Sequence, residues 1–172
     1  LYQWGEPLLN KDLPQILEAA HRRGVSCAIS SNLSLKNDLR PIVAARPGRF
    51  RISLSTWGKD YEITHTGGRW DLFRDNLLEL ARLRDELNPG MKTEVYYHVY
   101  KHNQGEPLHR VRGLCGELGL DFFPVWAYII GLDDVLGYLE GGELSGPGKE
   151  VSQMLDISVD EGMSLAYQER DK

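Results

Sequence analysis

Apolar runs of strand length alternate with amphipathic segments of helix length over most of this chain, and that order constrains the fold more than any other feature. We expect strands at the following runs: 1–4, 25–30 (VSCAIS), 50–55 (FRISLS), 92–100 (KTEVYYHVY) and 121–129 (DFFPVWAYI). Leu13, Ile16, Leu17 and Ala20 recur at helical spacing and predict the first helix. Further helices are expected at about 39–45, 70–87 and 106–118.

Strict strand and helix alternation with short connections predicts right-handed βαβ units and a parallel sheet. No Gly-x-Gly-x-x-Gly follows any strand, which argues against a dinucleotide-binding Rossmann domain. Polar residues instead gather beyond the carboxyl ends of the expected strands: Glu6, Asn32, Thr56, His102 and Asn103. These positions form the mouth of a barrel. The sequence therefore favours the α/β class, as a partial (β/α) TIM-like barrel of parallel strands with outer helices, over a doubly wound sheet.

The alternating pattern stops after Asp133. We expect residues 1–140 to form the partial barrel, and residues 141–172 to form a Gly-rich linker followed by a helix from Ser158 to Arg170.

Composition restricts the partners. Of the 172 residues, 41% are hydrophobic and 26% are charged, with a net charge of -5, which is ordinary for a globular domain. Dispersed Lys and Arg in an acidic chain argue against nucleic acid, and no apolar run is long enough to span a membrane. We expect a cytoplasmic protein with a small-molecule or peptide partner.

Two cysteines, Cys27 and Cys115, stand far apart without the spacing of metal ligands. Cys27 lies in a strand-like run and Cys115 on the apolar side of an expected helix, so both are interpreted as buried small side chains.

Gly5-Glu6-Pro7 ends the first run. A glycine lets the backbone approach a ligand closely and a proline stiffens the turn, so Glu6 could present its carboxylate to an ammonium group. The alternative is that Glu6 caps the following helix or pairs with a surface Lys.

The wider stretch YQWGEPLLNKDLPQILEAAHRRGVSCAISSN strongly resembles the second strand, helix and third strand of radical S-adenosylmethionine (SAM) enzymes. In that family a Gly-Gly-Glu-Pro-like motif holds the amino group of SAM. The resemblance assigns this role to Trp4, Gly5, Glu6 and Pro7, with Trp4 in place of the first glycine.

The resemblance continues over about residues 1–130 and implies further SAM contacts. FRISLSTWG looks like the fourth strand, whose serines meet the ribose or carboxylate of SAM, so Ser53 and Ser55 are candidates, and strand alternation puts both on one face. Asn32 ends the third strand, Asn103 follows the fifth strand as a ribose candidate, and Tyr128 in the sixth is a candidate to lie near the adenine.

The family keeps Cys-x-x-x-Cys-x-x-Cys, the ligands of a [4Fe-4S] cluster, after its first strand, and no such spacing occurs here. We therefore expect a piece of a larger enzyme whose cluster ligands lie outside this chain. The resemblance implies reductive cleavage of SAM to a 5′-deoxyadenosyl radical that abstracts hydrogen from a substrate, with flavodoxin or ferredoxin as reductant. The tail resembles the helix that precedes a cysteine-rich auxiliary-cluster domain in one subgroup.

Two other functions stay open. Three histidines and three acids could supply a divalent-metal hydrolase or isomerase: His65, His98, His102, Glu6, Glu94 and Asp60. Alternatively, the chain is a non-catalytic barrel fragment that binds a partner.

A Gly-containing loop, THTGGR, is flanked by the aromatic residues Trp57, Tyr61 and Trp70. With Gly67-Gly68 as a flexible point, this loop could close over a substrate, and Arg69 could bind a carboxylate of that substrate. The alternative for Trp70 is that it begins the long helix by packing on the sheet.

Overall fold

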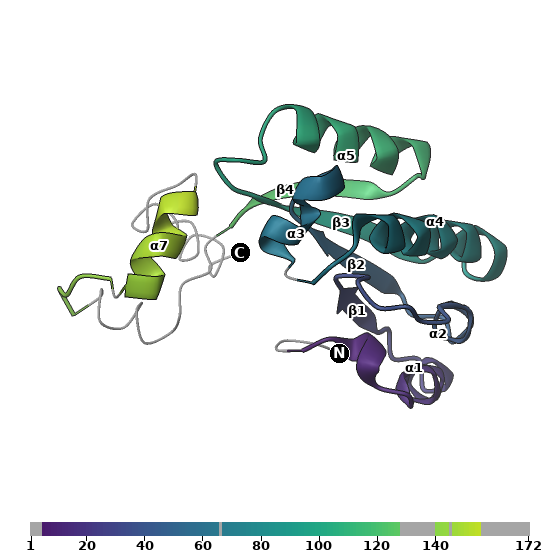
Figure 1. Cartoon of the computed structure of the whole chain (residues 1–172). Coiled ribbons are helices and arrows are strands. Elements are labelled where there is room, and N and C mark those ends of the chain that lie inside the picture. Colours follow the sequence, from purple (N-terminus) through teal and green to yellow (C-terminus); the bar gives the residue numbers. More distant parts are fainter. Residues whose placement is uncertain (1–4, 66, 128–139, 145, 156–172) are drawn as a thin grey trace. The chain divides into compact units, whose positions relative to one another are not determined.

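The computed structural model describes residues 5–65, 67–127, 140–144 and 146–155. Their core is a single four-stranded sheet in the order β1 (Ala28–Ser31), β2 (Arg49–Leu54), β3 (Lys92–Val99) and β4 (Asp121–Trp126), shown in Figure 1. Strand β2 pairs in parallel with both β1 and β3. The order of strands follows the order of the chain, as expected for successive βαβ units.

Four helices alternate with the strands: α1 (Leu13–Arg22), α2 (Arg40–Ala44), α4 (Trp70–Leu87) and α5 (Glu106–Glu117). The other described elements are two short 3-10 helices, η1 (Pro7–Leu9) and η2 (Gly58–Asp60), and two further α-helices, α3 (Tyr61–Thr64) and α7 (Gly146–Met154). Parallel strands with flanking helices confirm the predicted α/β class and are consistent with a partial (β/α) barrel.

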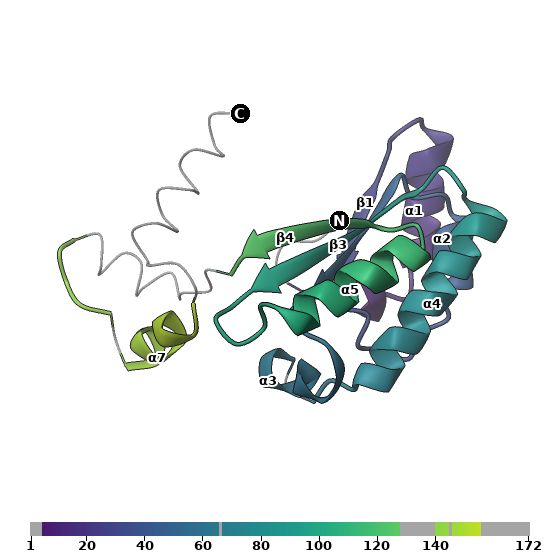
Figure 2. The same ribbon diagram turned by 90° about the horizontal axis from the view of Figure 1, so that it is seen from above.

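The two faces of the sheet differ. Phe50, Ile52 and Leu54 of β2 are fully buried, whereas the residues between them are half-buried. The buried side chains face the helices, which lie on one side of the strands in Figure 2. The opposite face carries Arg49, Arg51 and Ser53, and we call it the open face.

The strand register places the amino ends of β1, β2 and β3 together at one edge of the sheet. Ala28, Arg49 and Lys92 begin their strands and lie side by side, so the amino ends form one edge. The carboxyl ends of β1 and β2 lie at the opposite edge, where the loop that contains η2 and α3 follows β2.

The longest helix follows its sequence pattern. α4 has the predicted bounds, and its side chains Phe73, Leu77 and Leu80 are at most 1% exposed. Arg84 of α4 is also buried and donates from Nη1 and Nη2 to the carbonyl oxygens of Gly119 and Leu118, at 2.9 Å each. This arginine therefore ties α4 to the turn that leads into β4.

Strand β1 starts three residues later than the apolar run predicts. The N–H of Val25 donates to the carbonyl of Ala20 at 3.0 Å, and Val25 is 57% exposed. Residue 25 therefore completes the end of α1, after Gly24 with φ of 71°, and is not part of the sheet.

Contacts between residues group the chain into two units, and the second contains residues 98–104 and 124–172. Its described part has a small core of Tyr100, Ala127 and Leu155, with an antiparallel bridge between Tyr100 and Leu155. The expected division at residue 140 stays a prediction, and the helix expected at 158–170 lies outside the described residues. No helix in the described segments is both long and apolar enough to cross a membrane.

Candidate functional site at the carboxyl ends of β1 and β2

Glu6 holds two parts of the chain together through its carboxylate. Oε1 accepts the N–H of Leu8 at 3.0 Å and so caps η1, while Oε2 accepts the N–H of Asn32 at 3.2 Å, just beyond β1. The capping interpretation of Glu6 is therefore confirmed. A carboxylate has about four acceptor positions, so two N–H bonds leave capacity for an ammonium group.

The Gly5-Glu6-Pro7 turn positions this carboxylate. Gly5 has a φ of 150°, in a region that favours glycine, and Pro7 occupies the first position of η1, where no N–H is needed. The turn leaves the Glu6 side chain half-buried at the edge of the sheet.

Tyr61 continues the contacts from β1 to the loop after β2. Its hydroxyl donates to the Asn32 carbonyl at 3.3 Å and lies 2.8 Å from the Ser34 hydroxyl. Burial raises the pKa of Tyr61, the Ser34 hydrogen bond acts in the opposite sense, and the negative charge of Glu6 raises the pKa further. The phenol therefore stays protonated and remains a hydrogen-bond donor.

A second group of polar side chains follows β2. The Ser55 hydroxyl contacts the hydroxyl of Thr64 and lies 3.4 Å from Nδ1 of His65, which is 3.1 Å from Oγ1 of Thr64. The His65 ring stacks on Tyr61 with 4.4 Å between ring centroids and 9° between planes. Tyr61 thus joins the two groups, and we call the whole set the polar cluster: Glu6, Asn32, Ser34, Ser55, Tyr61, Thr64 and His65.

The two candidate serines have different surroundings. Ser53 belongs to β2, is half-buried on the open face and is in register with Tyr96. Ser55 lies beyond the last residue of β2, is 2% exposed and belongs to the polar cluster. The expected strand alternation stops at Leu54, because β2 ends there.

Asn103 shapes the turn after β3. It is fully buried, its Oδ1 accepts the N–H of Tyr100 at 2.7 Å, and its Nδ2 donates to the His98 carbonyl at 2.7 Å. Contact of Asn103 with a ribose stays a prediction. Trp4 and Tyr128 lie outside the described residues.

The aromatic loop residues pack against the start of α4. Trp70 is the first residue of α4, and its ring centroid lies 4.8 Å from that of Trp57 and 5.6 Å from that of Phe73. Trp70 therefore begins the long helix as predicted, and its packing on the sheet stays a prediction. Arg69 lines a hollow of about 500 Å³ together with Lys59, Glu62 and Asp71, and its contact with a substrate carboxylate stays a prediction.

The residues proposed for a metal-dependent hydrolase do not come together. Within the described segments, no three His, Cys, Asp or Glu side chains are placed to hold a metal ion. Glu94 is paired with Arg49 and Arg51. The geometry gives this alternative no support.

The residues present fit SAM better than they fit an iron–sulfur cluster. Glu6 offers acceptor capacity for the SAM amino group, and Ser53 offers a half-buried hydroxyl. The sequence has two cysteines, fewer than the three thiolates of the family cluster. Cys115 is buried in α5 and Cys27 lies before β1, away from the carboxyl edge.

Sequence reasoning missed the central position of Tyr61 and the packing at Gly68. A Cβ atom on Gly68 would lie 2.7 Å from Cε1 of Tyr61 and 2.8 Å from the His65 carbonyl oxygen. The Gly67-Gly68 pair was the available signal, but it was interpreted as a flexible point.

No family model and no curated protein sequence matches the chain. A domain of pyruvate-formate lyase-activating enzyme from Bacteroides vulgatus matches with a TM-score of 0.51 and 17% identity, over 72% of this chain and 73% of that domain.

SuiB from Streptococcus suis, in a structure bound to SAM, matches with a TM-score of 0.55 and 21% identity, over 80% of this chain and 35% of SuiB. A further SuiB structure matches with a TM-score of 0.54 and 20% identity, over 82% of this chain and 36% of SuiB. The chain thus spans about a third of SuiB. The described part therefore shares a partial (β/α) fold with both of these proteins.

Proposed function

We propose that this chain is the SAM-binding part of a radical SAM enzyme. The observation that carries the proposal is the position of Glu6, whose carboxylate joins the Gly-Glu-Pro turn to the end of β1 and keeps acceptor capacity at the sheet edge. The sequence resemblance and the fold of the SAM-bound neighbour support the same assignment.

In this proposal the chain binds and orients SAM. Glu6 accepts hydrogen bonds from the SAM ammonium, and the two backbone N–H groups fix the direction of its carboxylate. Tyr61 holds the Asn32 backbone, which in turn holds Glu6. Ser53 and Ser55 are the candidates for the ribose or carboxylate, and Asn103 would assist after β3.

A [4Fe-4S] cluster held outside this chain would supply the electron that cleaves SAM to methionine and a 5′-deoxyadenosyl radical. The contribution of these residues is orientation and exclusion of water. Hydrogen abstraction from a small-molecule or peptide substrate, reduction by flavodoxin or ferredoxin, and a cytoplasmic location belong to the same proposal. The fold does not fix the reaction type.

The first experiment is to read the native frame upstream of Leu1 and to purify the encoded protein without oxygen. We expect Cys-x-x-x-Cys-x-x-Cys in that sequence, and iron and acid-labile sulfide in the protein. A native protein without the motif or the iron would remove the radical function and favour a barrel that only binds a partner.

Replacing Glu6 tests the SAM site directly. We expect Glu6→Gln in the native protein to weaken SAM binding by about 1 to 3 kcal/mol, because a charge-assisted hydrogen bond is lost. Isothermal titration calorimetry with SAM measures the change. Glu18→Gln, on the exposed side of α1, is the matched control and should bind SAM normally. Equal affinities for Glu6→Gln and wild type would exclude Glu6 from the site.

A further inference from the structure

The amino end of the open face concentrates positive charge. Arg49 is in register with Lys92, and Arg51 is in register with Glu94, so these four side chains belong to one face of β2 and β3. Asp121, at the start of β4, is exposed to solvent. Three cationic and two acidic side chains leave one net positive charge here, although the whole chain carries -5.

Both arginines are held by one buried carboxylate. Nε of Arg49 lies 3.1 Å from Oε1 of Glu94, and Nε of Arg51 lies 3.4 Å from Oε2. The Glu94 side chain is 7% exposed, while those of Arg49 and Arg51 are 36% and 30% exposed. Glu94 carries one negative charge and contacts two arginines, so it cannot by itself neutralise both of them.

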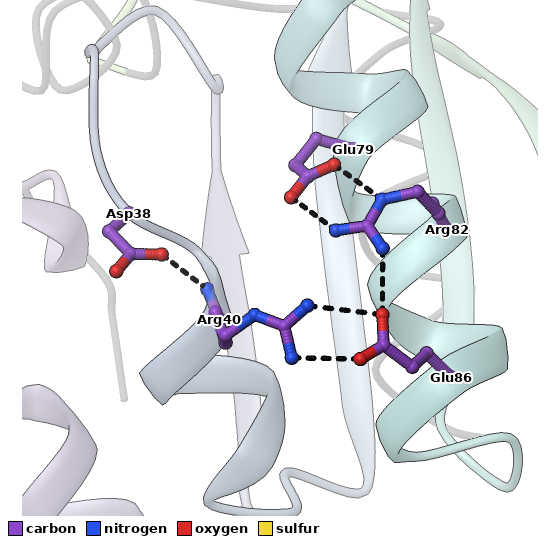
Figure 3. Close-up of polar contacts among 5 residues, drawn as sticks. All are labelled: Asp38, Arg40, Glu79, Arg82 and Glu86. Atoms are coloured by element: carbon purple, nitrogen blue, oxygen red, sulfur yellow. Dashed lines mark hydrogen bonds and ion pairs between the residues drawn. The ribbon is translucent and has the colours of Figure 1, made fainter.

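A second arginine network in this chain shows the balanced case. On the helices, Arg40 donates to both carboxylate oxygens of Glu86 at 2.8 and 3.1 Å, and Arg82 pairs with Glu79 and Glu86, as Figure 3 shows. Two arginines there meet two glutamates, whereas Arg49 and Arg51 share one. The network on the helices is therefore a surface ion-pair network with equal numbers of positive and negative charges. In the network on the strands, one glutamate faces two arginines.

A hollow lies beside the surplus charge. It has a volume of about 290 Å³ and is lined by Arg49, Lys92, Ser26, Cys27, Ala28 and Gly48. None of these lining side chains is acidic. A Cβ on Gly48 would collide with Oγ of Ser26, so the glycine backbone forms part of the wall. The volume is near the lower end for small-ligand pockets.

We propose that this hollow binds an oxyanion, either a carboxylate or a phosphate group, through the Arg49 guanidinium and the Lys92 ammonium. An arginine has five N–H donors in a planar fork that matches such oxyanions, and the contact with Glu94 involves Nε and so orients that fork. Glu94, which also contacts Arg51, is the positioning residue for Arg49. This site lies at the amino ends of the strands, opposite the polar cluster, and does not depend on SAM binding.

Titration of the whole chain with inorganic phosphate and with glutarate tests the proposal and separates the two kinds of oxyanion. We expect saturable binding of at least one probe with a Kd of about 1 mM or lower at low salt, measured by NMR shifts of the residues around the hollow. Arg49→Gln and Lys92→Gln should each weaken it by about 10-fold. Arg40→Gln, outside the hollow, is the matched control and should bind as wild type.

Arg49→Lys keeps the positive charge but removes the planar set of guanidinium donors. It is the variant to test if Arg49→Gln does not fold. We expect it to weaken binding less than Lys92→Gln weakens it in the same assay, because an ammonium at residue 49 still attracts the anion.

Absence of saturable binding of both probes to the wild type would overturn the proposal. Equal affinities for Lys92→Gln, the folded Arg49 variant and wild type would overturn it as well. Glu6→Gln should retain this binding, so failure of the SAM site and failure of the oxyanion site are distinguishable.

Discussion

Single residues in the polar cluster act through close packing as well as hydrogen bonds. Glu6 is the residue at which the sequence and structure agree best, since a carboxylate between Gly5 and Pro7 is visible in the sequence and lies at the sheet edge in the structure. Tyr61 shows the opposite case. Its neighbours Asn32 and Ser34 are 29 and 27 residues away in the chain, so sequence spacing does not reveal them.

A substitution at Gly68 tests the close packing around Tyr61. We expect Gly68→Ala to lower the free energy of unfolding by about 1 to 3 kcal/mol, because the added Cβ meets the buried Tyr61 ring and the His65 carbonyl at less than 3 Å. Urea unfolding followed by circular dichroism measures the loss.

Gly113→Ala is the control for that substitution. Gly113 lies inside α5, and an added methyl group there would meet no atom within 4 Å, so alanine should stabilise the protein by up to about 1 kcal/mol. Equal effects of the two substitutions would contradict the close packing at Gly68.

At the level of elements, strand β3 combines a helix-packed side and the open side. Val95 and Tyr97 are fully buried under the helices, whereas Tyr96 and His98 are half-buried on the alternate positions. Burial lowers the pKa of His98 from its ordinary value of 6.5. The folded protein therefore favours the neutral ring.

The burial of His98 in β3 should make the stability of the protein depend on pH. In the unfolded chain His98 binds its proton more tightly than in the folded chain, so stability is full above pH 6.5 and is lost as pH falls below it. Each unit of pKa difference corresponds to about 1.4 kcal/mol. We expect His98→Gln to lose less unfolding free energy than wild type between about pH 7.5 and 5, measured by urea unfolding.

His21, exposed in the last turn of α1, provides the control. The His21→Gln variant should keep the wild-type slope over the same pH range. A slope for His98→Gln as steep as that of wild type would mean that His98 is not the group responsible.

At the scale of the whole molecule, the two cysteines differ in access. Cys115 is 1% exposed inside α5, and burial raises its pKa to about 12, whereas Cys27 is half-buried beside the oxyanion hollow. Reaction with a thiol reagent requires the thiolate. Cys115 should therefore react only when the fold opens.

We expect iodoacetamide to modify Cys27 in the folded protein and both cysteines in denaturant, as measured by mass spectrometry of peptides. Cys27→Ser should leave a protein that is unmodified under native conditions and modified in urea in parallel with the loss of circular dichroism. Rapid native labelling of Cys115 would show that α5 does not pack stably on the sheet.

Much of the fold could be predicted from the sequence because its causes are local. The bounds of α4 follow from the spacing of Phe73, Leu77 and Leu80, and the parallel sheet follows from the alternation of strands and helices. The start of β1 could not be predicted, because Val25 is apolar but its N–H completes the turn after α1.

The sequence by itself determined the fold class, the amphipathic helices and the position of Glu6 at the end of a turn, since these depend on residue type and short spacing. Only the tertiary structure decided which distant residues meet. It brought Tyr61 to Asn32, separated Ser55 from Ser53, and placed one glutamate between Arg49 and Arg51. The physical reason is that strand register and side-chain burial depend on the packed sheet as a whole, which no short segment contains.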